Sequence, residues 1–167
     1  MLIVKTGYTK AVHPETRTVQ AVISTPDPDR QGDVVEVSGW QLENFLRNPV
    51  VLWMHRHDAP VARCVDIRKT RTGLVATARF ATTPLAEEIW QLYKQGVLRA
   101  WSVSFIAHQW EPLPSGGKRF TKQELLEYSC VSVPANPNAL SLAHRQALAR
   151  LSGPENKNDL VIEIKED

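Results

Sequence analysis

The sequence predicts one α+β domain that consists mostly of β-strands, arranged as a largely antiparallel barrel or open sheet with a few flanking helices. Short runs of β-branched and aromatic residues recur through the middle of the 167-residue chain, and Pro, Gly, Asn and Asp residues separate them. Only two segments combine helix-capping residues with apolar residues at helical spacing. Many strands and few helices favour a strand-built core with helices around it.

The first half of the chain is expected to be mainly strands. Asn48-Pro49 ends the one short helix there, because the residue before a proline disfavours helical geometry. The apolar run VVLWM is typical of a buried strand. The expected strands are residues 18–25, 50–54, 61–68 and 74–80, and the short helix is residues 39–47.

The clearest helix is predicted over residues 84–95, where Thr83 can cap the start and Gly96 suits the left-handed end. A long strand over 97–111 follows. Alternation places Trp101, Val103, Phe105 and Ala107 on one of its faces and Ala100, Ser102, Ser104 and Ile106 on the other.

A last strand is expected from about Leu125, with Glu127, Ser129 and Val131 on one face. Asn136 then caps a second helix that ends at Gly153-Pro154. We therefore assign residues 1–153 to one domain and residues 154–167 to a charged, flexible C-terminal tail.

Composition excludes several classes of function. The net charge of +2 is too small to indicate a nucleic-acid or anionic-membrane partner. The sequence contains no run of about 18 apolar residues, so it predicts no membrane span. The N-terminus has no signal-peptide pattern. The two cysteines, Cys64 and Cys130, lack the spacing of a disulfide framework or a zinc knuckle, which fits a reducing, cytosolic compartment.

His55 is the first candidate for chemistry, because it follows a buried strand and opens the polar stretch HRHD. A general base in that place is held rigidly yet reaches solvent. The local context alone favours a hydrogen-bonded edge histidine. A metal site of His55, His57 and Asp58 is a further alternative, although HxHD by itself is a weak zinc signal.

Ser102 and Ser104 interrupt an otherwise apolar strand, and no GxSxG elbow surrounds either hydroxyl. Backbone hydrogen bonding would ordinarily explain such serines. Glu127 is a lone carboxylate that could be a solvated strand residue, or could orient His55 and fix its tautomer. Asp58 and Asp66 compete with Glu127 for that orienting role.

Taken together, these segments resemble the tailed-phage prohead (capsid maturation) serine protease family. The blocks that carry the resemblance appear in the order expected for the family and cover nearly everything from residue 18 to residue 145. They are STPDPDRQGDVV (24–35), GWQLENFLRNPVVLWMH (39–55), PVARCVDI (60–67), GLVATARF (73–80), AEEIWQLYKQGVLRAWSVSF (86–105) and ELLEYSCVSVPANPNAL (124–140).

The resemblance implies a β-barrel surrounded by helices, similar to herpesvirus assemblin, with Ser102 as nucleophile and His55 as general base. Glu127 lies in the segment where such families place the partner of the histidine. The family commonly has glycine two residues after the nucleophile, and here that residue is Ser104, which makes Ser104 the second candidate nucleophile. Backbone amides in the turn over residues 133–138 are the expected oxyanion donors.

The resemblance further implies an endopeptidase that needs no metal or organic cofactor and matures phage proheads. Its expected substrates are the internal scaffold and the N-terminal extension of the major capsid protein. The expected setting is the host bacterial cytoplasm, inside the assembling prohead, with self-association and self-cleavage. A catalytically silent assembly protein of the same fold, and a metal-dependent hydrolase built on His55, His57 and Asp58, are the alternative functions.

Overall fold

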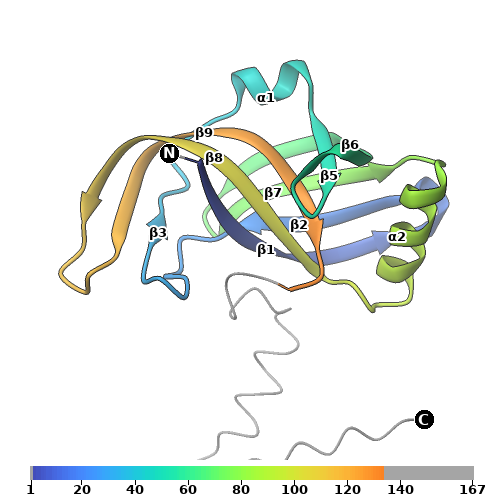
Figure 1. The fold of residues 1–167 in the computed structure, drawn as a ribbon, viewed down its shortest axis with the longest axis horizontal. Helices are drawn as coiled ribbons and strands as arrows, with labels where there is room; N and C mark the ends of the chain where they lie inside the picture. Colours follow the sequence, from blue (N-terminus) through green and yellow to red (C-terminus); the bar gives the residue numbers. More distant parts are fainter. Residues whose placement is uncertain (1, 134–167) are drawn as a thin grey trace, which may run out of the picture.

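The computed structural model describes the chain from Leu2 to Val133, and this part folds around a closed β-barrel (Figure 1). Nine strands belong to its sheet: β1 (Leu2–His13), β2 (Thr18–Ser24), β3 (Val34–Val35), β4 (Trp40–Gln41), β5 (Val50–Trp53), β6 (Arg56–Thr70), β7 (Gly73–Phe80), β8 (Ala100–Pro112) and β9 (Lys118–Val131). The helices of the described chain are the one-turn η1 (Pro14–Thr16), the short α1 (Glu43–Arg47) and α2 (Pro84–Lys94).

The barrel closes through β9. The ring runs β9-β5-β6-β7-β2-β1-β8, and the pairing of β8 with β9 completes it. The β5–β9 pair is parallel, whereas the other pairs of this ring are antiparallel. The short strands β3 and β4 add to β9 outside the ring. The expected largely antiparallel barrel with few helices is therefore confirmed.

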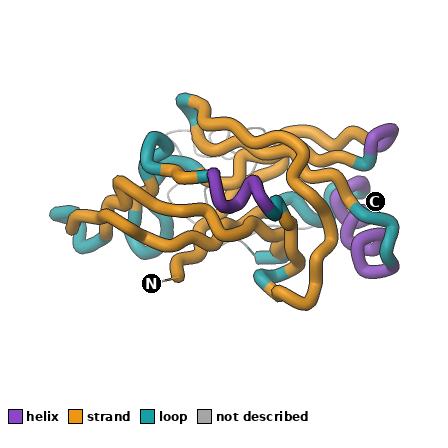
Figure 2. Tube along the Cα trace, turned by 90° about the horizontal axis from the view of Figure 1, so that it is seen from above, coloured by secondary structure: helices purple, strands orange, loops and turns teal. Residues whose placement is uncertain are grey.

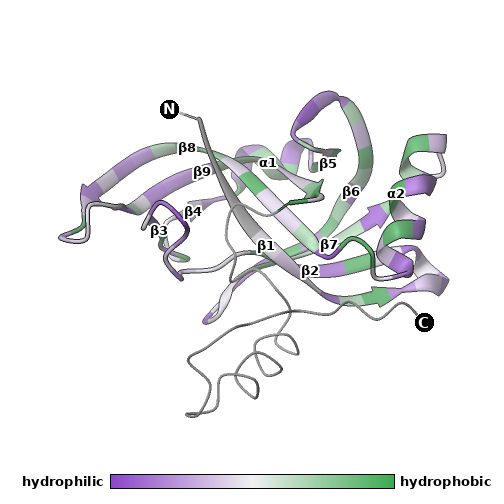
Figure 3. Ribbon diagram, turned by 60° about the horizontal axis from the view of Figure 1, so that its bottom comes forward, coloured by the Kyte–Doolittle hydropathy of each residue, from purple (hydrophilic) through white to green (hydrophobic). Residues whose placement is uncertain are grey.

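The two main helices lie apart on the surface of the barrel (Figure 2). The far ends of β8 and β9 extend beyond the barrel as a two-stranded ribbon, and its outer part is largely hydrophilic (Figure 3). None of the helices in the described part of the chain is long and apolar enough to cross a bilayer.

Most predicted elements are present, and several boundaries differ. The segment 39–47 divides into β4 and α1, because Trp40 and Gln41 pair with β9 before the helix begins. β6 starts at Arg56, and β9 starts at Lys118 because it pairs with β8 along the whole ribbon. β8 begins at Ala100 instead of residue 97.

Two further predictions about the ends of elements have clear outcomes. Thr83 occupies the N-cap position of α2, but its side chain makes no capping hydrogen bond, so that expected contact is wrong. Gly96 has the left-handed φ of 75° that was expected after this helix. The second predicted helix and the C-terminal tail lie outside the described residues.

The core fixes the start of β8, the strand that carries both candidate serines. Trp101, Val103 and Phe105 point into the hydrophobic core and are fully buried. Tyr93 of α2 packs on Trp101 with ring centroids 4.8 Å apart and donates a hydrogen bond of 2.6 Å to the carbonyl oxygen of Ala100. Because residues alternate along a strand, Ser102 and Ser104 share the opposite face.

Candidate active site

His55 lies in the tight turn between β5 and β6. Trp53 and Arg56 pair across this turn, and the two residues between them, Met54 and His55, have left-handed φ values of 54° and 59°. Glycine, asparagine or aspartate ordinarily takes such positions, and other residues there cost about 1–3 kcal/mol each. The turn that carries the candidate base is therefore strained.

Two hydrogen bonds hold this turn against β9. The amide of Met54 donates to the carbonyl oxygen of Cys130 at 3.0 Å. The amide of His55 donates to the hydroxyl of Ser129 at 3.1 Å. The strained conformation depends on contacts with a strand that lies more than 70 residues later in the chain.

The imidazole of His55 faces a buried carboxylate. Its Nδ1 lies 2.7 Å from Oε1 of Glu127, and the side chain of Glu127 is only 6% exposed. A carboxylate at Nδ1 accepts the proton of that nitrogen and leaves Nε2 as the free base. Nε2 is buried and has no hydrogen-bond partner among the described residues.

Ser102 and Ser104 are both buried beside this group. They pair across the sheet with Ser129 and Glu127, respectively, so two serines of β8 face a serine and a carboxylate of β9. The hydroxyl of Ser104 lies 3.0 Å from Nδ1 of His55. Ser104 is thus on the Nδ1 side of the ring, together with Glu127.

The electrostatics of Glu127 combine two opposing effects. Burial raises the pKa of its carboxyl group, whereas hydrogen bonds from His55, Ser104 and Ser129 lower it, and the net pKa lies below the ordinary value. Ser129 donates to Oε2 of Glu127 at 2.7 Å. At neutral pH the carboxylate is therefore ionised, as an acceptor for the Nδ1 proton must be.

The other acidic candidates lie in different surroundings. Asp58 and Asp66 are exposed and pair with arginines of their own strand, Arg56 at 3.0 Å and Arg68 at 3.1 Å. His57 is exposed beside Asp58. Within the described range, no group of three or more histidine, cysteine or acidic side chains is arranged to hold a metal ion.

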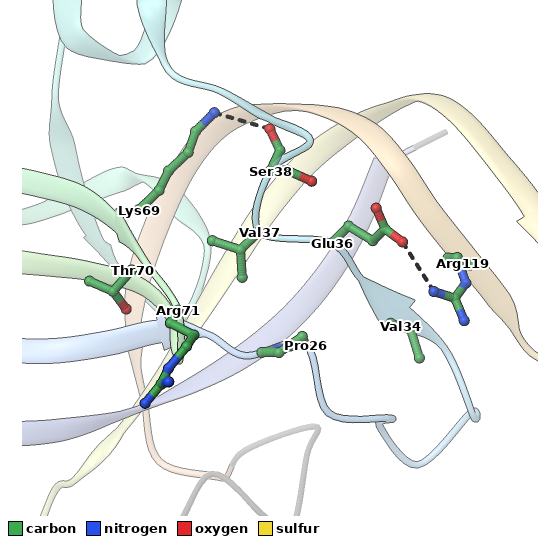
Figure 4. A pocket seen from close by; sticks show the side chains of 9 residues that line it. All are labelled: Pro26, Val34, Glu36, Val37, Ser38, Lys69, Thr70, Arg71 and Arg119. Atoms are coloured by element: carbon green, nitrogen blue, oxygen red, sulfur yellow. Dashed lines mark hydrogen bonds and ion pairs between the residues drawn. The ribbon is translucent and has the colours of Figure 1, made fainter.

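A separate hollow of about 680 Å³ lies beside the β6–β7 hairpin (Figure 4). It contains both a serine and a lysine, but Lys69 donates to the main-chain oxygen of Ser38 at 3.2 Å instead of to its hydroxyl. Arg119 there forms an ion pair with Glu36. The hollow therefore lacks the serine–base contact that the His55 group can provide.

Sequence reasoning did not single out Ser129, which bonds both His55 and Glu127, although it placed Ser129 on the face of Glu127. The alternation of β9 was the available signal, because it places both side chains on the same face of the sheet. Most of the turn expected to supply oxyanion donors lies outside the described residues.

The serine hydroxyl that contacts the imidazole is that of Ser104, at Nδ1. Serine hydroxyls, an imidazole and a buried carboxylate in one place are the groups of a serine hydrolase. The model of the family described as caudovirus prohead serine protease matches residues 36–151. This chain belongs to that family of serine proteases.

Two individual phage proteins are similar to this chain. The prohead protease of Escherichia phage T5 is 30% identical over 143 residues, which cover 80% of this chain and 67% of that protein. The capsid polyprotein of Pseudomonas phage PAJU2 is 36% identical over 138 residues, which cover 78% of this chain and only 20% of that protein.

The solved structure of the bacteriophage T4 capsid assembly protease shares the fold. It matches with a TM-score of 0.64 at 8% sequence identity, over 80% of this chain and 98% of that one. At so low an identity, the likeness concerns the barrel alone.

Proposed function

We propose that this chain is an endopeptidase in which Ser102 is the nucleophile, His55 the general base and Glu127 the orienting carboxylate. The observation that carries the proposal is the contact of His55 Nδ1 with the buried, ionised Glu127. Because Glu127 accepts the proton on Nδ1, Nε2 is the ring nitrogen that can accept a proton from the attacking hydroxyl. Ser104 is on the Nδ1 side, which favours Ser102 as the serine that uses Nε2.

In this mechanism, His55 Nε2 removes the proton of Ser102 as its oxygen attacks the scissile carbonyl. The same nitrogen then returns the proton to the leaving amine, and water releases the acyl group in a second cycle. Glu127 holds the imidazole and stabilises its protonated form. No step requires a metal ion.

The proposed substrates are capsid precursors of the same phage. One relative is named a capsid polyprotein and another a prohead protease, and these names motivate the choice. Within that scheme, this chain cuts the major capsid protein extension and the scaffold inside the prohead in the host cytoplasm. It acts as a self-associating domain of residues 1–153 with a separate tail over 154–167.

Incubation of the protein with the cognate capsid and scaffold proteins tests the proposal. We expect wild type to cleave them, Ser102→Ala to lower the rate by about 10⁴-fold or more, and Ser104→Ala to retain substantial activity. The opposite result for the two serines would assign the attack to Ser104. Absence of cleavage by wild type would favour a silent assembly protein, and loss of cleavage in EDTA with recovery in zinc would favour the metal hydrolase.

A further inference from the structure

Ser129 is a fully buried serine at the middle of the candidate active site. It lies opposite Ser102 of β8 on one side and Leu52 of β5 on the other. Its hydroxyl receives the hydrogen bond of the His55 amide and donates its own proton to Oε2 of Glu127. A buried hydroxyl with both a donor and an acceptor in place has a defined orientation.

These bonds form a closed circuit around His55. Glu127 holds the ring of the histidine through Oε1, and Ser129 connects Oε2 of the same carboxylate to the main-chain amide of the same histidine. The main chain and the ring of His55 are therefore fixed to a single carboxylate. Such a circuit restricts the side-chain torsions that set the direction of Nε2.

The left-handed turn makes this restraint necessary. Met54 and His55 both have positive φ without the freedom of glycine. The bond from Met54 to Cys130 uses main-chain atoms and is available to any sequence. The bond from His55 uses a side chain, so it depends on the identity of residue 129.

We propose that Ser129 is a positioning residue, whose hydroxyl locks the strained His55 turn to Glu127 and thereby aims the imidazole at the nucleophile. This inference rests on the proposed function of Ser102 and His55. It assigns Ser129 no contact with the substrate and no part in proton transfer to it.

Labelling of the nucleophile by a fluorophosphonate probe tests the proposal without a protein substrate. We expect Ser129→Ala to keep the wild-type far-UV spectrum and to lower the second-order labelling rate by about 10-fold to 100-fold, the range expected when a reacting group is displaced by about 1 Å. Ser24→Ala, which removes an equally buried hydroxyl from β2, should label at the wild-type rate.

A rescue experiment separates positioning from packing. Glycine adopts left-handed φ without strain, so adding Met54→Gly to Ser129→Ala should recover several-fold of the lost labelling rate. The same glycine should not rescue Glu127→Gln.

The outcomes distinguish this inference from the proposed function. If Ser129→Ala labels at the wild-type rate while Ser102→Ala does not label, Ser129 is not a positioning residue and the proposed function stands. Lost labelling that Met54→Gly does not recover, or a loss that accompanies an unfolded spectrum, would also overturn the positioning role. Labelling of Ser102→Ala at the wild-type rate would overturn the proposed function itself.

Discussion

Single residues set the chemistry of this site, and Glu127 shows how. Glu127 is the one buried carboxylate in the described part of the chain, and hydrogen bonds from three side chains hold it ionised against the effect of burial. We expect Glu127→Gln to lower the cleavage rate by up to about 10⁴-fold, because an amide no longer fixes the tautomer with the proton on Nδ1. Steady-state cleavage of the capsid precursor measures this change. A loss smaller than about threefold would contradict the orienting role.

The lowered pKa of Glu127 also predicts how stability depends on pH. A carboxyl group whose pKa is lower in the folded state stabilises that state above its unfolded pKa of about 4.3, and this contribution is lost as pH falls through the folded value. Wild type should therefore exceed Glu127→Gln in unfolding free energy by about 1–2 kcal/mol near pH 7, and the difference should vanish in stronger acid. Urea unfolding of both proteins at several pH values measures it, and parallel pH profiles would contradict the prediction.

The sequence predicted the chemical groups better than their connections. His55 and Glu127 are 72 residues apart, and their contact exists because β5 pairs with β9, which local patterns do not reveal. The left-handed turn at Met54-His55 was not predicted either, because its sequence lacks the usual turn residues. Alternation did align Glu127 with Ser129, but a serine in a strand gives no sign that it receives a distant amide.

At the level of elements, β1 is the longest strand that sequence patterns missed. Its central glycine weakens the strand signal, because glycine lowers strand propensity. In the structure Gly7 is required by a close approach, since a Cβ atom there would collide with the carbonyl oxygen of Val22 in β2. The residue that conceals the strand in the sequence therefore permits its pairing in the barrel.

Gly7→Ala should destabilise the barrel by about 2–3 kcal/mol, because the colliding atoms belong to main chain that cannot rotate away. The midpoint of urea unfolding measures the change. Gly116→Ala is a suitable comparison, because an added Cβ at that site would meet no atom within 4 Å although its φ of 92° carries some strain. Equal effects of the two substitutions would contradict the collision.

The elements with clear periodicity and clear end signals were predicted most accurately. Residues 74–80 and the helix at 84–95 combine strong periodicity with clear end signals, and both lie close to the predicted bounds. The two-residue strands β3 and β4 depend on parallel pairing with β9, and so short a run carries no periodicity of its own.

For the whole molecule, residues 154–167 are the expected target of self-trimming, because their composition predicts an exposed segment and maturation proteases of this family are expected to trim themselves. The segment ENKNDLVIEIKED is charged around one short apolar cluster, a pattern that buries little apolar surface. We expect wild type to lose a fragment from beyond about residue 150 over time, and Ser102→Ala to remain full length. Intact-mass measurement follows the process. Persistence of the segment in both proteins, or its loss from both, would contradict trimming.

The barrel also determines when during synthesis the site can exist. His55 directly follows β5 and Glu127 lies in β9, the two strands of the parallel pair, and β9 is the last strand of the ring in chain order. While β9 is still inside the ribosome, the emerged part of the chain carries His55 and both β8 serines. It still lacks the carboxylate of Glu127 and the hydroxyl of Ser129. Under the proposed function, the catalytic group is therefore complete only after β9 has paired with β5 and β8.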